Sequence, residues 1–275
     1  MVDTIQEDAR PETGSGAGAD IDKVLKKGLQ PAGSTIRRMF ADVAPRYDFL
    51  NHTLSGGVDR LWRRHTVRRA LEPFGDAKDA RVLDLCSGTG DLALAFAAKG
   101  SSVIGADFCP EMLEIGEQKR RGAKGGPCLG FLAADAQALP FLEDQFDLAT
   151  VAFGIRNVQD PECGLAEMRR VVKPGGKVYV LEFSRPRTPI LGPAYMWYFR
   201  HVLPRLGSWL SRGSRDSKAY DYLPESVLEF PDREAFLDLM RAAGLTDCSY
   251  RLLSFGIAAL YEGRVLGEER VQGDS

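Results

Sequence analysis

Short apolar runs alternate with amphipathic segments along most of the chain. The runs have the length and side-chain types of buried strands, and the segments between them place apolar residues at helical spacing. The pattern predicts seven strands, at Val82–Cys86, Val103–Asp107, Leu129–Ala133, Phe146–Ala152, Lys177–Phe183, Asp247–Leu253 and Ile257–Glu262. It predicts helices at Val58–Leu71, Asp91–Lys99, from Pro110 onward, at Pro161–Val172 and at Asp232–Ala243, with a turn at 174–176. Such alternation gives an α/β, Rossmann-like fold, a mostly parallel seven-stranded sheet with helices on both faces.

The same pattern divides the chain into segments. Residues 1–33 are acidic and rich in Gly, Ala and Pro, so we expect a mobile tail there. Residues 34–75 are helical in pattern and precede the first strand, which suits a lid. The main domain spans 76–263, and its alternation is interrupted at 185–230, where we expect a substrate cap. Residues 264–275 form a C-terminal tail.

Composition narrows the class of protein. A net charge of −2 disfavours a nucleic-acid partner, because phosphate binding needs a basic excess. The five cysteines are scattered without Cys-x-x-Cys spacing and the three histidines are dispersed. This favours a reducing, cytoplasmic compartment and disfavours a metal site. No long uncharged apolar run occurs, so we expect no transmembrane helix.

The turn after the first strand carries the clearest chemical signal. Gly88 and Gly90 allow bare backbone to approach a nucleotide-like ligand, and acids flank them at Asp84 and Asp91. A diphosphate would meet these acids as like charges, whereas a ligand with an ammonium and a sulfonium would meet them as partners. That ligand is S-adenosylmethionine, and the corner is therefore interpreted as a methyl-donor site.

Two further strand ends complete the predicted donor site. Asp107 ends the second strand, where a carboxylate can accept hydrogen bonds from both ribose hydroxyls. Asp135 and Ala136 follow the third strand, where a carboxylate and a backbone N–H suit an adenine edge. Because the carboxyl ends of parallel strands meet at one edge of the sheet, these groups are expected to lie together.

Other interpretations of these residues stay open. Gly88, Gly90 and Ala93 also fit a dinucleotide fingerprint, so a nicotinamide-dependent oxidoreductase is a rival. Asp91 also suits a helix start without any ligand, and Asp135 also suits a turn. A nucleic-acid base methyltransferase and a non-catalytic scaffold are further rival classes.

Several longer segments then point to one family. They are Tyr47–Ser55 running on to Trp62, Phe153–Val158, Arg170–Gly176 with Leu181–Ser184, and Tyr222–Ser226. On these segments the chain resembles the quinone-pathway C-methyltransferases, which methylate demethylmenaquinol and, in some organisms, a polyprenyl-benzoquinol of ubiquinone synthesis. The resemblance covers roughly residues 36–263. Three positions depart from the family pattern: Leu50 replaces a usual Met, Asp59 a His, and Ala152 a Ser.

The resemblance implies a class I S-adenosylmethionine-dependent methyltransferase that acts on a prenylated quinol. It places cofactor contacts on Thr89, Asp107, Asp135 and Ala136. The expected reaction is methylation of demethylmenaquinol to menaquinol, and methylation of 2-methoxy-6-polyprenyl-1,4-benzoquinol is the alternative.

Carbon methylation of a quinol needs an ionised ring, and a phenol of pKa about 10 is mostly protonated at neutral pH. We expect Arg156 to be the positive group beside the ring oxygen and Asn157 to orient that oxygen. The candidate proton acceptors are His201, Tyr47, and Asp135 through water. The alternative for Arg156 is a surface salt bridge with an acid such as Asp160.

The segment from Ile190 to Leu210 is dense in aromatic and aliphatic residues. It suits an apolar tunnel for an isoprenoid tail, a face dipped into a membrane, or plain core packing. Four arginines on one helical arc could attract lipid headgroups or form a solvated face: Arg60, Arg63, Arg64 and Arg68. We therefore expect a cytoplasmic enzyme in peripheral contact with the inner membrane surface. Its oligomeric state stays open, with a homodimer among the alternatives.

Overall fold

The computed structural model of the chain describes residues 33–123, 129–189, 191–202 and 226–267. The chain divides into two compact units, residues 1–30 and 31–275, and all described residues belong to the second. The predicted tails and much of the predicted cap, including Leu203, Leu206 and Trp209, lie outside the described residues.

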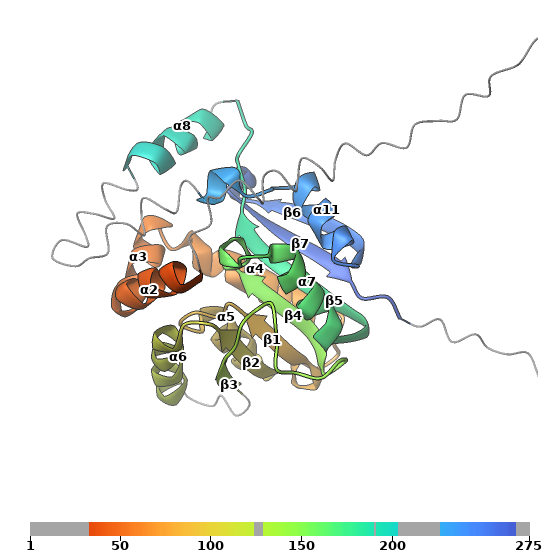
Figure 1. Cartoon of the computed structure of the whole chain (residues 1–275). Coiled ribbons are helices and arrows are strands. Elements are labelled where there is room, and N and C mark those ends of the chain that lie inside the picture. Colours follow the sequence, from red (N-terminus) through yellow and green to blue (C-terminus); the bar gives the residue numbers. More distant parts are fainter. Residues whose placement is uncertain (1–32, 124–128, 190, 203–225, 268–275) are drawn as a thin grey trace, which may run out of the picture. The chain divides into compact units, whose positions relative to one another are not determined.

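A seven-stranded sheet in the order β3-β2-β1-β4-β5-β7-β6 forms the centre of the described domain (Figure 1). Its strands are β1 (Arg81–Leu85), β2 (Ser102–Asp107), β3 (Leu129–Ala133), β4 (Phe146–Ala152), β5 (Val172–Phe183), β6 (Thr246–Leu253) and β7 (Ala258–Arg264). The first five strands pair in parallel, and β7 runs antiparallel between β5 and β6. The predicted mostly parallel sheet is confirmed.

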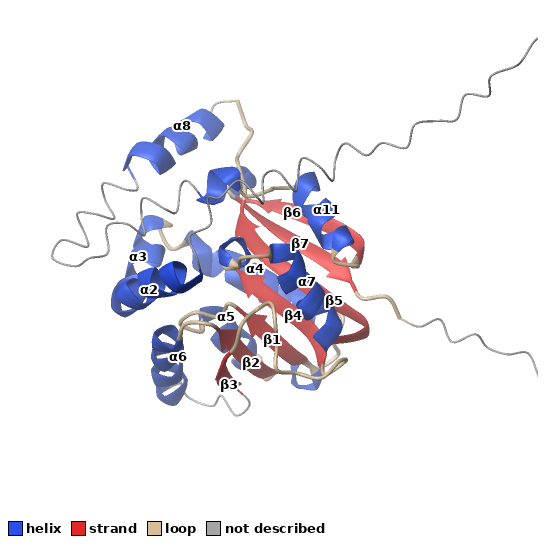
Figure 2. Cartoon of the chain, viewed as in Figure 1, coloured by secondary structure: helices blue, strands red, loops and turns tan. Residues whose placement is uncertain are grey.

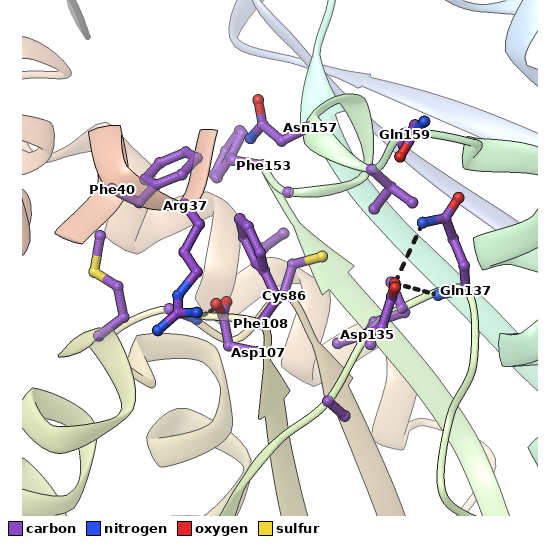
Figure 3. A pocket seen from close by; sticks show the side chains of 18 of the residues that line it. Arg37, Phe40, Cys86, Asp107, Phe108, Asp135, Gln137, Phe153, Asn157 and Gln159 are labelled. Carbon is purple, nitrogen blue, oxygen red and sulfur yellow. Dashed lines mark hydrogen bonds between the residues drawn. The ribbon is translucent and has the colours of Figure 1, made fainter. Parts of the chain in front are cut away.

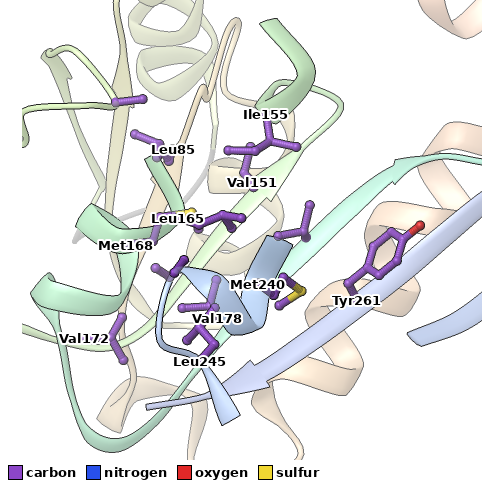
Figure 4. Close-up of a cluster of buried hydrophobic side chains, with 14 of the residues drawn as sticks. Leu85, Val151, Ile155, Leu165, Met168, Val172, Val178, Met240, Leu245 and Tyr261 are labelled. Atoms are coloured by element: carbon purple, nitrogen blue, oxygen red, sulfur yellow. The ribbon is translucent and has the colours of Figure 1, made fainter. Parts of the chain in front are cut away.

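Helices cover both faces of this sheet (Figure 2). One face carries α4 (Val58–Leu71), α5 (Asp91–Ala97) and α6 (Pro110–Gly122), and the other carries α7 (Pro161–Val171) and α11 (Glu234–Ala242). Successive strand residues point to opposite faces, so Val82 packs with α4 and α5 while Leu83 packs with α7 and α11. Figure 4 shows the core on the face covered by α7 and α11, which includes Leu165 and Met168 of α7 and Met240 of α11.

Most of the remaining elements lie at the edge where the parallel strands end, whereas the turn at Ala77–Asp79 leads into β1 at the opposite edge. Before β1 come α2 (Gly33–Val43), a 3₁₀ turn at Ala44–Arg46, α3 (Tyr47–Leu54) and α4. After β5 come α8 (Leu191–Trp197) and a π-helical turn at Tyr198–Val202. Further 3₁₀ turns are η2 (Ala77–Asp79), η3 (Ile155–Asn157) and η5 (Ser254–Gly256).

The bounds of β3, β4 and α4 agree with the predicted ones, whereas β5 begins five residues before its predicted start. The predicted turn at 174–176 instead pairs with its neighbours. Gly175 N–H donates to Val265 O and Val265 N–H donates to Gly176 O, both at 2.9 Å. Val172 also pairs with Phe146 before the register shifts, so the strand continues through a proline that periodicity treats as a break.

Candidate functional site

A cavity of about 340 Å³ lies at the carboxyl ends of β1, β2 and β4 (Figure 3). Its floor includes Gly88, Asp107 and Asp135, which follow or end three neighbouring strands. Its other walls come from Tyr47 of α3 and Asn157 of η3. The structure thus brings together residues from the lid helices and from the sheet edge, as open α/β sheets do at their ligand sites.

The turn between β1 and α5 has a backbone that favours glycine. Gly88 and Gly90 have φ of 56° and 81°, in the left-handed region. A side chain at Gly90 would place its Cβ 2.5 Å from the ring of Phe131, so glycine is needed there for space as well as for conformation. Gly90 N–H donates to Ser87 O at 2.9 Å and closes the turn. Gly90 therefore shapes the cavity floor without lining it.

The Asp107 carboxylate is held at the cavity by two backbone hydrogen bonds. Its Oδ2 accepts from Gly88 N–H at 2.9 Å and its Oδ1 accepts from Cys109 N–H at 2.8 Å. A carboxylate has about four acceptor positions, so capacity remains for ligand hydroxyls. Burial raises the pKa of Asp107 to about 6, against backbone hydrogen bonds that lower it. The group is therefore ionised at neutral pH and ready to accept.

Asp135 and Ala136 also line the cavity. The Asp135 carboxylate accepts from Gln137 N–H at 2.9 Å, which forms a local turn and fixes the side chain at the cavity wall. The turn-forming role and the cavity position, which the sequence offered as alternatives, therefore occur together.

Asp84 does not reach the cavity, although the sequence suggested a donor contact there. It is 1% exposed, and its carboxylate accepts from Ser87 Oγ at 2.8 Å and from Thr150 Oγ1 at 3.2 Å. Burial raises the pKa of Asp84 to about 7, although both hydroxyls lower it. Asp84 lies within β1, and its hydrogen bonds join this strand to the turn that follows and to β4, so it is a buried group of the sheet rather than a lining group.

Asp91 and Thr89 belong to a polar network that joins α3 to α6 and to the start of α5. Lys119 of α6 contacts Asp91 at 2.7 Å and also pairs with Asp48 of α3, which accepts from Thr89 Oγ1. Lys119 thus already neutralises Asp91, the acid expected to meet a ligand cation. Thr89 is buried in this network and does not line the cavity.

The network continues into α4. His52 Nδ1 lies 2.8 Å from Asp59 Oδ2, and its Nε2 lies 3.4 Å from Asp91. Asp59 also pairs with Arg63 and accepts from Ser55 Oγ. The family's usual His is Asp59 here, and in this chain its carboxylate serves as the centre of an ion-pair cluster between α3 and α4.

Arg156 is buried beside the cavity rather than in its wall. Its Nη1 donates to Glu182 Oε1 and to Phe153 O, each at 2.7 Å. The side chains of Arg156 and Glu182 are 8% and 2% exposed. The sequence offered a surface salt bridge with an acid such as Asp160 as the alternative for Arg156. Arg156 does form a salt bridge, but the pair is buried and its partner is Glu182.

The negative charge of the buried Glu182 carboxylate is only partly compensated by Arg156. Burial raises the pKa of the Glu182 carboxyl, although the Arg156 guanidinium opposes that shift. Its Oε1 also accepts from Phe183 N–H at 2.8 Å, and its Oε2 is buried with no hydrogen-bond partner among the described residues. The pair therefore joins the end of β5 to the turn that carries Asn157.

Of the other proposed catalytic residues, some line the cavity and some do not. Tyr47 and Asn157 line the cavity, and the buried Oδ1 of Asn157 has no hydrogen-bond partner in the described part of the chain. His201 is exposed and stacks on Trp197, with its Nδ1 3.1 Å from Trp197 O, and it does not line the cavity. The structure brings two of the four candidates to the cavity, Tyr47 and Asn157.

Several lining residues were missed by the sequence argument. Phe108 follows the strand-end acid Asp107 directly, and that position could have signalled a ring beside a ribose-binding carboxylate. No strand-end signal marks the lining residues of α2. The missed group is Arg37, Phe40, Phe108, Met112, Gln137 and Gln159.

The chain is similar to known proteins over most of its length. The family model described as the ubiE/COQ5 methyltransferase family matches residues 29–264. A demethylmenaquinone methyltransferase of Thermus thermophilus is 48% identical over 227 residues, which is 82% of this chain and 99% of that protein. A ubiquinone/menaquinone biosynthesis C-methyltransferase UbiE of Geobacter sulfurreducens is 45% identical over 244 residues, 88% of this chain and 92% of the relative.

The solved structures agree at the level of the fold. An S-adenosylmethionine-dependent methyltransferase of Thermotoga maritima has a TM-score of 0.52 at 20% identity, covering 83% of this chain and 99% of that one. The chain belongs to the ubiE/COQ5 methyltransferase family and has the class I, Rossmann-like methyltransferase fold.

Proposed function

We propose that the chain transfers a methyl group from S-adenosylmethionine to a ring carbon of a prenylated quinol. Demethylmenaquinol is the proposed substrate, and 2-methoxy-6-polyprenyl-1,4-benzoquinol is the second candidate because one relative carries both pathways in its name. The observation that carries the proposal is the cavity at the strand ends, with the Asp107 carboxylate on its floor, in a chain of this family.

The lining residues fit the donor chemically. Asp107 has unused acceptor capacity for ribose hydroxyls, because its two oxygens accept only from Gly88 N–H and Cys109 N–H. Phe108 and Met112 add apolar surface suited to a flat base. When bound, S-adenosylmethionine supplies a methyl group on a sulfonium, whose charge is lost on transfer to carbon.

The chain's own residues then prepare the acceptor. We assign Asn157 to orient a ring hydroxyl and Tyr47, or Asp135 through water, to take its proton. The proton on the methylated carbon then leaves and the ring oxygen is reprotonated, so that one proton is released for each methyl group transferred. Phe40 and Phe153 line the same cavity and exclude water, which strengthens the electrostatic interactions inside. Arg156 is assigned as a positioning residue, because it holds Phe153 O and the turn that carries Asn157. We assign no proton transfer to His201.

The test uses donor with a labelled methyl group and a reduced demethylmenaquinol with a short tail. Label in the naphthoquinol ring supports the proposal, and absence of label from both quinol types overturns it. Label in the benzoquinol alone would select the second candidate. Calorimetry with NADH separates the oxidoreductase rival, which predicts NADH binding and no donor binding.

We also propose that the protein is cytoplasmic and works at the inner membrane surface, where prenylated quinols reside. Among the described helices, none is long and apolar enough to cross a membrane.

A further inference from the structure

One surface beside the cavity combines exposed apolar side chains with unopposed positive charge. Leu61, Arg64 and Arg68 of α4 are all exposed and follow each other at i, i+3 and i+7, so they form one stripe. Arg251 of β6 lines the same surface hollow as Arg69 of α4, so β6 brings a further arginine beside this helix. Phe255 of η5 completes the group. We name these five residues the α4–η5 patch.

The apolar members of the patch are held outward. Phe255 is 72% exposed and Leu61 is 59% exposed. Phe255 also has a φ of 59°, an unfavourable backbone for a bulky side chain. The neighbouring Ser254 accepts a 2.9 Å hydrogen bond from the Trp62 indole, which fixes η5 against α4. The fold therefore holds an aromatic ring in water at a cost that packing does not explain.

The charge of the patch has one sign. Residues 60–71 and 248–261 contain no Asp or Glu. Within the described residues, Arg64 and Arg251 have no ion-pair partner, in contrast to Arg63 and Arg69, which pair with Asp59 and Glu262. In a chain with net charge −2, this is a local concentration of positive charge that suits an anionic partner.

The η5 end of the patch lies at the same edge of the sheet as the cavity. η5 immediately precedes β7, whose first residue, Ala258, pairs with Phe183 at the carboxyl end of β5. The Trp62 ring packs against Phe153, a cavity-lining residue, with ring centroids 5.9 Å apart. Trp62 therefore connects η5, through Ser254, with the cavity wall at Phe153.

We propose that the α4–η5 patch docks the protein on an anionic phospholipid bilayer, with Phe255 and Leu61 inserted among the headgroups and the arginines on lipid phosphates. Inserted apolar side chains and surface arginines are the two elements of interfacial binding. The proposal rests on the proposed function in one respect, since a prenylated quinol would reach the cavity from the same bilayer.

The test measures co-sedimentation of the full chain with phosphatidylcholine vesicles, with and without phosphatidylglycerol. We expect binding that requires phosphatidylglycerol and weakens with salt. The double variant Arg64→Glu/Arg68→Glu should lose about 30-fold or more in partitioning, since each basic residue near the surface contributes about fivefold. Phe255→Asn keeps a residue that tolerates left-handed backbone and should also weaken binding.

Matched controls remove charge or apolar surface elsewhere. Arg121→Glu/Arg241→Glu makes the same charge change on α6 and α11, and Leu142→Ser removes an apolar side chain that is 75% exposed. Binding that is equal in patch and control variants, equal on both vesicle types, or absent altogether overturns the proposal.

Turnover separates this proposal from the proposed function. Methylation of a soluble, tail-less quinol should be unchanged in the patch variants, while methylation of a long-tailed quinol embedded in vesicles falls. If the wild-type chain methylates neither quinol, the proposed function fails, and the vesicle result still decides the docking proposal independently.

Discussion

The Arg156–Glu182 pair predicts a strongly non-additive double-mutant cycle. Both side chains are almost fully buried and their charged atoms lie 2.7 Å apart. Arg156→Met leaves Glu182 as a buried, uncompensated carboxylate, and Glu182→Met leaves a buried guanidinium. Each single substitution should therefore cost about 3–5 kcal/mol of unfolding free energy.

The double variant Arg156→Met/Glu182→Met removes both charges and fills similar volume. It still loses the hydrogen bonds to Phe153 O and from Phe183 N–H, each with a net contribution of about 1 kcal/mol. We expect it to cost no more than about 2 kcal/mol, so that it is more stable than either single variant. The coupling energy is then at least about 4 kcal/mol.

Urea unfolding at pH 7, followed by circular dichroism, measures all four proteins. Single-variant costs that simply add in the double variant would refute the buried-pair reasoning. Turnover gives a second result from the same proteins. A role for Arg156 limited to compensating Glu182 predicts that the double variant binds donor and recovers turnover to within about tenfold of wild type. A folded, donor-binding but inactive double variant would show that the hydrogen bond to Phe153 O, or the guanidinium itself, is needed for turnover.

Three further outcomes are expected. Because the pKa of Asp84 is raised in the folded state, its contribution to the free energy of unfolding is full below pH 3.8 and is lost as pH rises to about 7, a loss of about 4 kcal/mol. Asp84→Asn should therefore reduce the difference in unfolding free energy between pH 5 and pH 8, as measured by denaturant titration. An unchanged difference would contradict this. Asp107→Asn should weaken donor binding in calorimetry by about tenfold or more, and wild-type affinity should fall as pH drops through about 6; affinity that is level from pH 5 to pH 8 would count against a carboxylate contact. Gly154→Ala places a Cβ 2.3 Å from Cys86 Cβ and should cost about 1–3 kcal/mol with weaker donor binding, whereas Gly130→Ala, which meets nothing within 4 Å, should not reduce donor binding.

Periodicity was sufficient to predict most of the fold. The strands β3 and β4 are short, mainly apolar runs, and their predicted and observed bounds agree to the residue. The start of β5 could not be predicted, because Pro174 and Gly175 have the composition of a break. The long-range hydrogen bonds to Val265 that keep this segment in the sheet leave no local signal.

The candidate site was predictable only where strand ends define it. Asp107 and Asp135 reach the cavity because their positions follow from sheet topology. Arg37 and Phe40 come from α2, whose packing across the strand ends has no counterpart in local sequence. The charges were the least predictable part: Asp84, Asp91 and Arg156 each have partners in three dimensions, so their distance from a ligand could not be inferred from spacing.

Lys119 holds two acids that belong to different elements, Asp48 of α3 and Asp91 at the first turn of α5. A displacement of α3 away from the sheet would break its contact with an ammonium group that α5 also uses. We therefore expect the exchange of a ligand past α3 to be coupled to the order of the turn before α5. Because these pairs are partly exposed, ionic strength should set how often that exchange occurs.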